Sequence, residues 1–431
     1  MPGRSLRSRA AAGLARLLVL AAVLTATSAC SGNSDRSAPT LREVAAVLAR
    51  HGKAVLDHDR SAFMAGVDGA SKATAFWRDQ SAEYANLVQL PLTRWSYRVN
   101  ARTGDRAAER AAGRALGATA IVVKIDLSYA LRRADPVPTT RSLWWTFVRQ
   151  DGHVVAAGDG ALADAGGTSW QGPWDFGRLT VVRGRDCLVL GHADPSVLRP
   201  IAATVDAAVP AVSAVWTLPW TRFVVVVVPG SAEELAATVG PSSSIGTDVA
   251  AAAISDGADP VTGEVSGQRL VINPDALARL TPVGERIVVR HEITHIAAAR
   301  DTTDATPPWV REGFAEYVGN LGTGQSVGTA ATELRADVLA GRVPTALPDP
   351  AAFDGGSGVA QAYEQAWLAC RLIATRVGAA GLVRFYRVVG ADVEDEQGAV
   401  AAGLRAVLHE TTAQFTAQWR AYLRQQLDPA Q

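Results

Sequence analysis

The segment GERIVVRHEITHIAAAR, residues 284–300, carries the pattern H-E-x-x-H. We predict a helix over 283–299, and helical residues four apart lie about 40° from each other around the axis. His291 and His295 can therefore present their imidazoles to one metal ion. Glu292 sits beside this pair, where its carboxylate can take a proton from a water molecule that the metal activates. The alternative is a surface helix that matches the pattern by chance.

A second helix-like segment, PPWVREGFAEYVGN at residues 307–320, supplies a third ligand. It places Glu312 seventeen residues after His295. A catalytic zinc site needs three protein ligands and one open position, so we predict that Glu312 completes the site. Glu316 lies one turn further along and shares a helix face with Glu312. A solvated surface charge is the alternative role for Glu316.

These two segments resemble the gluzincin clan of metallopeptidases, in which HExxH is followed by a Glu ligand on the next helix. The sequence WVREGFA at 309–315 matches the W-L-N-E-G-F-A pattern of the aminopeptidase branch, although its spacing from HExxH is two residues shorter. The resemblance implies one Zn²⁺ per chain, held by His291, His295 and Glu312. It also implies that Glu316 orients His291.

The resemblance covers roughly residues 195–431 and implies how a peptide bond is cleaved. Glu292 would accept a proton from the attacking water and pass it to the leaving amine. In gluzincins a Tyr commonly donates a hydrogen bond to the developing oxyanion. Tyr363, at the start of a helix after the Gly-rich segment FDGGSGVAQ, is our candidate. Tyr386 and Tyr317 are the competitors, and a structural role for Tyr363 is the alternative.

The segments around the motif also resemble this clan. QRLVINPD, residues 268–275, occupies the place of an edge strand that binds extended peptide. QRLVIN has no acid where aminopeptidases carry the Glu that binds a free amine, so cleavage specificity stays open. The helices after the site resemble the peptidase MA-like family. We therefore expect a small sheet followed by a helical lobe.

The N-terminal residues have the composition of a targeting signal. Arginines precede and enter the apolar run LLVLAAVLTA at 17–26, and small residues follow up to Cys30. This order predicts a secretory signal peptide over 1–29. Cys30 is placed as in a bacterial lipobox, although Thr27 stands where Leu is usual. Residues 30–40 would form a polar tether. We expect an exported protein on the outer face of the bacterial cytoplasmic membrane, anchored by a lipid on Cys30. An ordinary signal peptide with an incidental Cys is the alternative.

The pattern of helix-like and strand-like segments in the mature chain changes near residue 194. Residues 41–194 begin with amphipathic patterns that predict helices at 41–58 and 72–88, and continue with strand-like segments separated by turn signals. This order predicts an α+β domain with an antiparallel sheet. It resembles the cone-shaped nuclear-transport-factor-2-like fold. The partner of this domain is unknown, and 195–431 form the gluzincin-like domain.

Charge and cysteine content narrow the class of function. The chain has 431 residues, 42 basic and 42 acidic side chains, and three cysteines. Removal of 1–29 takes away four arginines and no acids, which leaves 38 basic against 42 acidic residues. This balance argues against a nucleic-acid partner, and three cysteines cannot form a disulfide scaffold. We expect Cys187 and Cys370 to be ordinary thiols.

We conclude from the sequence that the chain is an exported, lipid-anchored zinc peptidase that hydrolyses peptide bonds by a metal-activated water. Its expected partners are a peptide or protein substrate and, through the N-terminal lipid, the membrane. The competing hypothesis is a cell-surface binding or assembly lipoprotein that keeps a peptidase-like domain without turnover. The complete HExxH motif with a third Glu favours the enzyme, because a decayed site usually loses a ligand or the base.

Overall fold

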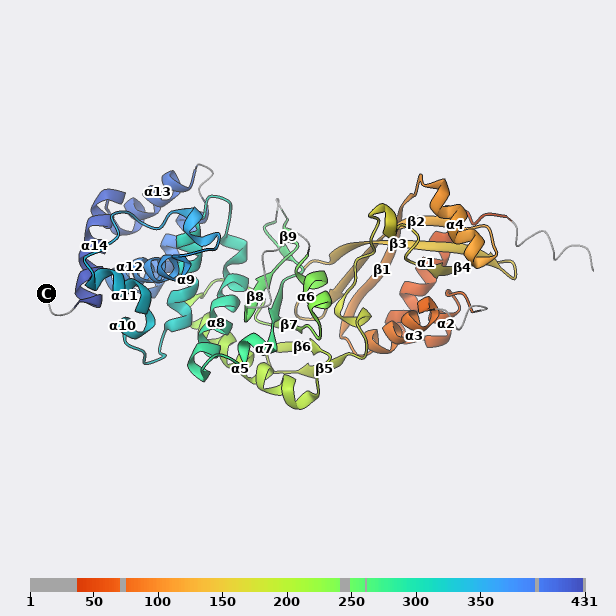
Figure 1. Ribbon diagram of the computed structural model, residues 1–431, viewed down its shortest axis with the longest axis horizontal. Helices are drawn as coiled ribbons and strands as arrows, with labels where there is room; N and C mark the ends of the chain where they lie inside the picture. The colour runs from red at the N-terminus through yellow and green to blue at the C-terminus, as the bar shows by residue number, and fades with distance from the viewer. Residues whose placement is uncertain (1–36, 70–74, 241–248, 260–261, 392–394, 429–431) are drawn as a thin grey trace, which may run out of the picture. The chain divides into compact units, whose positions relative to one another are not determined.

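The computed structural model describes residues 37–69, 75–240, 249–259, 262–391 and 395–428 (Figure 1). The predicted signal peptide, Cys30 and the first part of the predicted tether lie outside the described residues. Mixed helices and strands with antiparallel pairing confirm the α+β class.

The described residues form two compact units. The N-terminal unit contains the described residues up to Tyr84, with Trp95–Ser128 and Thr140–Trp170. The C-terminal unit contains Ala85–Arg94, Tyr129–Thr139 and the described residues from Gln171 onward.

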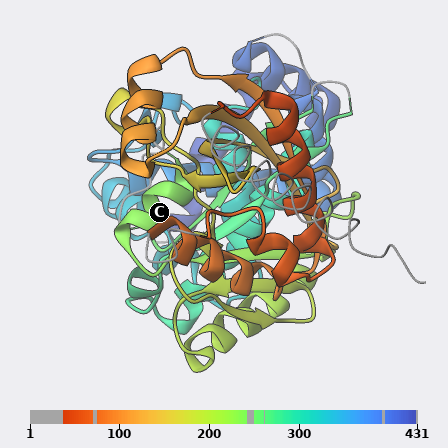
Figure 2. The same cartoon turned by 90° about the vertical axis from the view of Figure 1, so that its right-hand side faces the viewer.

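The N-terminal unit is built around a four-stranded sheet in the order β1-β2-β3-β4. Its first helices are drawn in red in Figure 2. The elements of this part of the chain are α1 (Leu41–Leu56), α2 (Arg60–Met64), α3 (Ala75–Leu87), β1 (Leu92–Arg102), α4 (Arg106–Leu116), β2 (Ile121–Leu131), β3 (Thr139–Gln150) and β4 (His153–Gly158). Helix α1 begins at a capping box, in which Thr40 and Glu43 satisfy each other's backbone N–H groups. Strands β3 and β4 pair antiparallel. The helix predicted at 41–58 is present as α1, and α3 lies within the range predicted at 72–88, of which residues 72–74 are outside the described residues. The resemblance to the cone-shaped fold stays a prediction.

His51 belongs to the core of the N-terminal unit. It is 1% exposed and stacks on Phe63 with ring centroids 3.8 Å apart. Its Nδ1 lies 3.1 Å from the backbone oxygen of Phe63. Burial lowers the pKa of His51 to about 4, so the ring is neutral and structural at ordinary pH.

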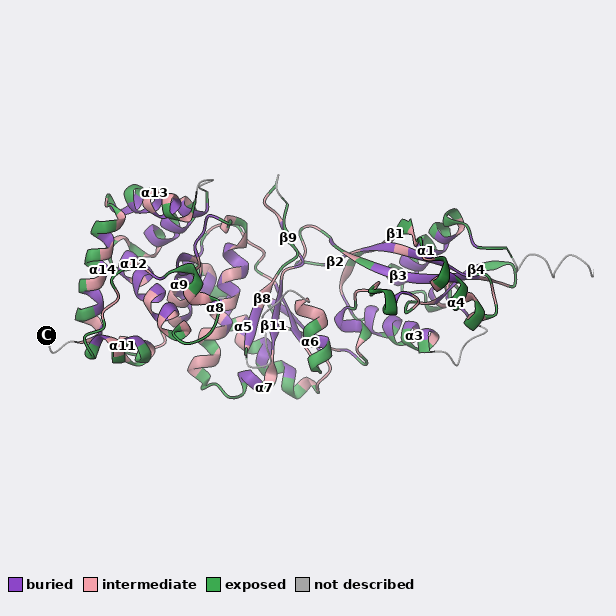
Figure 3. Cartoon of the chain, turned by 45° about the horizontal axis from the view of Figure 1, so that its top comes forward, coloured by how far each residue is buried: buried purple, intermediate pink, exposed green. Residues whose placement is uncertain are grey.

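The C-terminal unit contains a five-stranded sheet in the order β5-β6-β7-β11-β8. Its strands are β5 (Thr180–Arg183), β6 (Cys187–Gly191), β7 (Val224–Val228), β8 (Ala251–Ile254) and β11 (Arg269–Ile272), and a separate pair is β9 (Gly257–Ala258) with β10 (Val265–Ser266). Strands β6, β7 and β11 run parallel, whereas β5 and β8 are antiparallel to their neighbours. The three parallel strands are buried along their whole length (Figure 3), as expected for parallel strands.

The predicted boundary near residue 194 does not coincide with this division. Strands β5 and β6, which the sequence assigned to the first domain, hydrogen-bond into the sheet of the C-terminal unit. The reason is the crossover from β6 through α5 (Pro195–Val215) to β7, because parallel neighbours need a long connection. The chain therefore enters the second sheet before the helix that seemed to begin the second domain.

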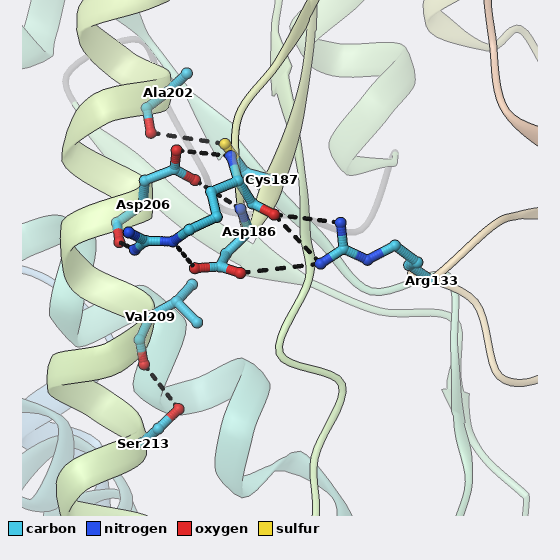
Figure 4. Close-up of polar contacts among 8 residues, drawn as sticks. Arg133, Asp186, Cys187, Ala202, Asp206, Val209 and Ser213 are labelled. Carbon is cyan, nitrogen blue, oxygen red and sulfur yellow. Dashed lines mark hydrogen bonds and ion pairs between the residues drawn. The ribbon is translucent and has the colours of Figure 1, made fainter.

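Helix α5 is fixed to the turn between β5 and β6 by polar contacts (Figure 4). The Asp206 carboxylate accepts hydrogen bonds from the backbone N–H groups of Arg185 and Asp186, each at 2.8 Å. Beside them, Cys187 Sγ lies 3.6 Å from the Ala202 backbone oxygen. Burial, with the nearby Asp206 charge, raises the pKa of Cys187 to about 12. Cys187 and Cys370 are both free and buried, which confirms that they are ordinary thiols.

Helices make up the rest of the C-terminal unit (Figure 1). They are α6 (Ala232–Val239), α7 (Pro274–Leu277), α8 (Pro282–Ala298), α9 (Pro308–Asn320), α10 (Val327–Ala330), α11 (Thr332–Leu339), α12 (Val359–Gly390), α13 (Glu396–Leu408) and α14 (Thr412–Leu427). Within the described part, α5 and α12 are long and apolar enough to cross a membrane by length and composition alone. Both supply residues to the hydrophobic core, and α12 contains a kink at Gly378. We therefore interpret both as core helices.

Candidate metal centre

Helix α8 positions the HExxH residues by burying its opposite face. The helix is capped by Thr281, whose side chain accepts a hydrogen bond from the Gly284 N–H at 3.1 Å. Val289 and Ile293 are fully buried in the core, and α8 packs against α5 and α9. This packing fixes the rotation of α8 about its own axis, and so directs His291 and His295 to the same side.

Helix α9 brings Glu312 to the histidines because it packs closely between α8 and α12. A Cβ atom on Gly313 would lie 2.3 Å from the backbone oxygen of Ala366 on α12, so a side chain at this position would push the helices apart. Glu312 itself is 7% exposed. The glycine beside the predicted ligand therefore serves the approach of α9 to α12.

Three potential ligand atoms converge at this point. The Nε2 atoms of His291 and His295 are 3.0 Å apart. Oε2 of Glu312 lies 3.2 Å from each of them. A tetrahedral zinc ion with bonds of about 2.1 Å holds its ligand atoms roughly 3.4 Å apart. The spacing and the imidazole and carboxylate chemistry thus both fit one small cation, and within the described residues this is the one cluster of its kind.

Glu316 supports His291 from behind. Its Oε1 lies 3.1 Å from Nδ1 of His291, and its Oε2 accepts a hydrogen bond of 3.0 Å from Asn320. A carboxylate at Nδ1 keeps the proton on that nitrogen and leaves Nε2 free to bind a metal. The chain Asn320, Glu316, His291 thus fixes both the orientation and the tautomer of this imidazole.

The charges of the cluster stabilise one another. Burial lowers the pKa of His291, but the carboxylates of Glu312 and Glu316 outweigh it and raise the pKa well above the usual value. Burial raises the pKa of Glu312, but His295 and His291 outweigh it and hold the pKa well below its usual range. Because an imidazole must lose its proton to bind a metal, we expect metal affinity to fall as the pH falls.

Glu292 lies in the same cavity but outside the group of ligand atoms. Its Oε2 accepts a hydrogen bond of 2.8 Å from the backbone N–H of Ala253 on β8. The cavity has a volume of about 670 Å³, and its lining includes His291, Glu292, His295 and Glu312. Glu292 is therefore fixed beside the cluster without joining it, as the sequence predicted.

Of the three candidate tyrosines, Tyr363 is the one that lines this cavity. Its ring centroid lies 6.2 Å from that of His291, and it also packs on Phe353 at 5.3 Å. Burial raises the pKa of Tyr363, and the charges of Glu312 and Glu292 raise it further, so the hydroxyl stays protonated. Tyr386 is buried in the core and hydrogen-bonds Thr302 at 2.8 Å.

The strand that borders the cavity is β8, whereas the sequence predicted an edge strand at 268–275. QRLVIN forms β11, which lies inside the sheet between β7 and β8. The edge position belongs to β8, whose residues Ala251–Ile254 line the cavity. The prediction of an edge strand at 268–275 is therefore wrong. Nothing local in the sequences of β8 and β11 shows which of these two neighbouring strands is outermost.

Sequence reasoning also missed two supporting residues. Nε of Arg311 donates a hydrogen bond of 2.9 Å to Oε1 of Glu312, which leaves Oε2 to face the histidines. Asn320 fixes Glu316 from one turn further along the helix. The spacing of four residues between Glu316 and Asn320 was a signal that could have identified the second contact.

Glu364, next to Tyr363 on α12, is a buried acid that the sequence did not single out. Its carboxylate accepts hydrogen bonds from the backbone N–H groups of Glu333 at 3.3 Å and Leu334 at 2.6 Å. Burial and a side-chain hydrogen bond with Glu333 raise the pKa of Glu364 to about 8. The two acids thus share one proton at neutral pH.

We expect this proton to make folding stability depend on pH. Unfolded Glu364 loses its proton near pH 4.5, whereas the folded chain keeps it up to about pH 8, so stability should fall as the pH rises between these values. Glu364→Gln should remove this part of the slope. After allowance for solvent screening, we expect the free energy of unfolding to change by about 1 kcal/mol, which corresponds to roughly 2–4 °C in Tm. Thermal unfolding of both proteins from pH 5 to 8.5 measures it, and parallel Tm curves would contradict the shared proton.

Comparison with protein-family models, with curated proteins and with solved structures finds no match for this chain.

Proposed function

We propose that the chain is a zinc-dependent peptidase of the gluzincin type, exported and anchored by a lipid on Cys30. The observation that carries this proposal is the convergence of His291, His295 and Glu312, whose ligand atoms lie within 3.2 Å of one another. The same cavity holds Glu292 and is bordered by an edge strand. Hydrolysis of a peptide by a metal-activated water needs a set of metal ligands, a general base and a surface that holds the substrate close to both.

His291, His295 and Glu312 would hold the ion, with Glu316 and Arg311 fixing a ligand each. When bound, zinc supplies Lewis-acid chemistry that lowers the pKa of water to about 7 and polarises a carbonyl. An ion held by three protein ligands would still be able to bind water or a carbonyl oxygen.

The edge strand β8 offers a way to hold the substrate. An extended peptide can add to a free sheet edge through main-chain hydrogen bonds, which depend little on its sequence. Ala251, Ala252 and Ala253 have small side chains, which leave room for a substrate strand beside the cluster. We therefore expect a peptide substrate bound in extended form, with no requirement for a free N-terminus.

Glu292 would carry the proton of the reaction. Its carboxylate would accept the proton from the attacking water and give it to the nitrogen of the leaving amine, so that the base is regenerated in each cycle. The hydrogen bond from the Ala253 N–H holds one oxygen of Glu292 at the strand edge, where the scissile peptide would lie.

Tyr363 would donate its hydroxyl proton in a hydrogen bond to the oxygen of the attacked carbonyl. The raised pKa of Tyr363 keeps this donor available. We expect Tyr363→Phe to lower kcat by about 10²–10³-fold with little change in KM or zinc content, which is the usual effect of losing one oxyanion donor. The variant keeps the ring that packs on Phe353. Steady-state kinetics measure this, and unchanged kcat would leave Tyr363 with a structural role.

The test of the proposed function is metal content together with hydrolysis. The chain from residue 31 onward keeps every described residue. After purification it should contain about one zinc per chain and hydrolyse casein or a peptide library. A chelator should abolish this hydrolysis, and added zinc should restore it. A folded chain without stoichiometric zinc and without hydrolysis would overturn the peptidase proposal and favour the binding-lipoprotein alternative.

A further inference from the structure

The N-terminal unit contains a large open cavity with no role in the proposed chemistry. Its volume is about 1050 Å³. It is lined by five arginines: Arg102, Arg106, Arg110, Arg114 and Arg149. Such a concentration of guanidinium groups on one cavity predicts an anionic ligand.

Three of these arginines are already engaged in ion pairs. Arg102 and Arg106 contact the buried carboxylate of Glu109 at 2.7 and 3.2 Å. Arg149 contacts Glu43 at 2.8 Å. Glu109 also accepts a hydrogen bond from the backbone N–H of Val122, which ties α4 to β2. These pairs fix the wall of the cavity and neutralise part of its charge.

Arg110 and Arg114 are the arginines left over. Both side chains are exposed, and neither guanidinium group makes a hydrogen bond or ion pair with another described residue. Together with Arg106 they are spaced four residues apart along α4, so the three lie within about 80° around the helix axis. The outer face of α4 is exposed (Figure 3). Asp68 and Asp151 also line the cavity, so the positive charge is concentrated on the α4 side.

Part of the cavity lining is apolar. Ala120 and Val148 belong to a small hydrophobic cluster beneath α4, and Leu116 packs against this cluster. A lining that combines guanidinium groups with apolar side chains suits a ligand that carries both a phosphate and a hydrocarbon part. A phospholipid headgroup with its glycerol and upper acyl segments has this chemistry.

The start of the described chain lies at the cavity. Ala38 lines the cavity and lies eight residues after Cys30. Eight residues span at most roughly 29 Å when fully extended. With the lipid attachment at Cys30 that we propose, the cavity therefore cannot move further than this from the membrane surface.

We propose that the arginine-lined cavity of the N-terminal unit binds the phosphate headgroups of anionic lipids, through Arg110 and Arg114. The lipid on Cys30 and this cavity would then be two separate attachments. A basic surface that contacts anionic lipids is a common second attachment of lipid-anchored proteins.

Vesicle binding by the unlipidated chain from residue 31 onward tests this proposal. The chain should cosediment with vesicles that contain phosphatidylglycerol and not with pure phosphatidylcholine vesicles, and binding should weaken between 50 and 200 mM salt. Each arginine near an anionic surface strengthens binding by about fivefold. The double variant Arg110→Gln, Arg114→Gln should therefore bind roughly 30-fold more weakly. Gln keeps the helix propensity of these positions.

The matched control removes the same charge elsewhere. Arg405 and Arg424 are exposed on α13 and α14, and the variant Arg405→Gln, Arg424→Gln should bind like the parent. Equal binding to both vesicle types, or equal binding by parent and Arg110→Gln, Arg114→Gln, would overturn the proposal. Binding of inorganic phosphate that needs Arg110 and Arg114, without vesicle binding, would overturn it in favour of a soluble anion. Zinc content and peptide hydrolysis in solution should be unchanged, so this test is independent of the peptidase proposal.

Discussion

Glu292→Gln is expected to lower kcat/KM for peptide hydrolysis by about 10²–10⁴-fold while the chain keeps one zinc ion, because a positioned acid or base contributes a factor of this size. The amide of Gln has nearly the shape of the carboxylate, and its oxygen can still accept the hydrogen bond from the Ala253 N–H. It cannot accept a proton from water at neutral pH. The variant therefore separates proton transfer from metal binding and from the position of β8.

Steady-state kinetics on a peptide substrate, with zinc analysis of the same sample, measure this effect. Glu285→Gln is the matched control, because Glu285 lies on the same helix and hydrogen-bonds Thr204 at 2.7 Å, outside the lining of the cavity. It should have the activity of the parent. If Glu292→Gln is as active as the parent, Glu292 is not the base. If neither the parent nor Glu285→Gln shows zinc-dependent hydrolysis, the assignment of a peptidase is wrong.

The ligand cluster could be predicted from the sequence because its rules are local. Residues four apart on a helix share a face, so the pair His291 and His295 needs only the helix, which was expected at 283–299 and spans Pro282–Ala298. The pair Glu312 and Glu316 follows the same rule on α9. What the sequence alone could not give was that the two helices meet. That depends on contacts between distant parts of the chain, such as the approach of Gly319 on α9 to α8, where a Cβ atom would lie 3.0 Å from the backbone oxygen of Ile287.

The strands were predicted less well because their partners lie far away in the sequence. The segment CLVLG, residues 187–191, is a short apolar run that would suit either the antiparallel sheet of the first domain or a parallel sheet of the second. Its pairing with Val224–Val228 places it in the second sheet, and that partner lies far along the chain. The choice between β8 and β11 as the edge has the same cause. The role of Arg311 could not be predicted either. In the sequence it is one charged residue beside a predicted ligand, and only the structure shows its hydrogen bond to Glu312.

The second large effect is expected at the third ligand. Glu312→Gln should lower zinc affinity more than 100-fold, beyond the roughly 10–100-fold that losing a supporting contact costs. Its Oε2 is the atom that faces both imidazoles, and a neutral amide oxygen is a much weaker ligand for zinc than a carboxylate. The substitution keeps the volume of the side chain, so the packing of α9 against α12 should survive.

Glu316→Gln is the comparison that makes this result specific. Glu316 contacts Nδ1 of His291 on the side away from the ligand atoms, so its loss should weaken zinc binding by the smaller factor of roughly 10–100-fold. Competition with a chromogenic chelator measures both affinities, and circular dichroism checks that both variants are folded. The reverse order of effects would exchange the roles of Glu312 and Glu316. Equal zinc affinities in the parent and both variants would show that zinc binds elsewhere. A site formed by His291, His295 and Glu312 must lose affinity when the Glu312 carboxylate is replaced by an amide.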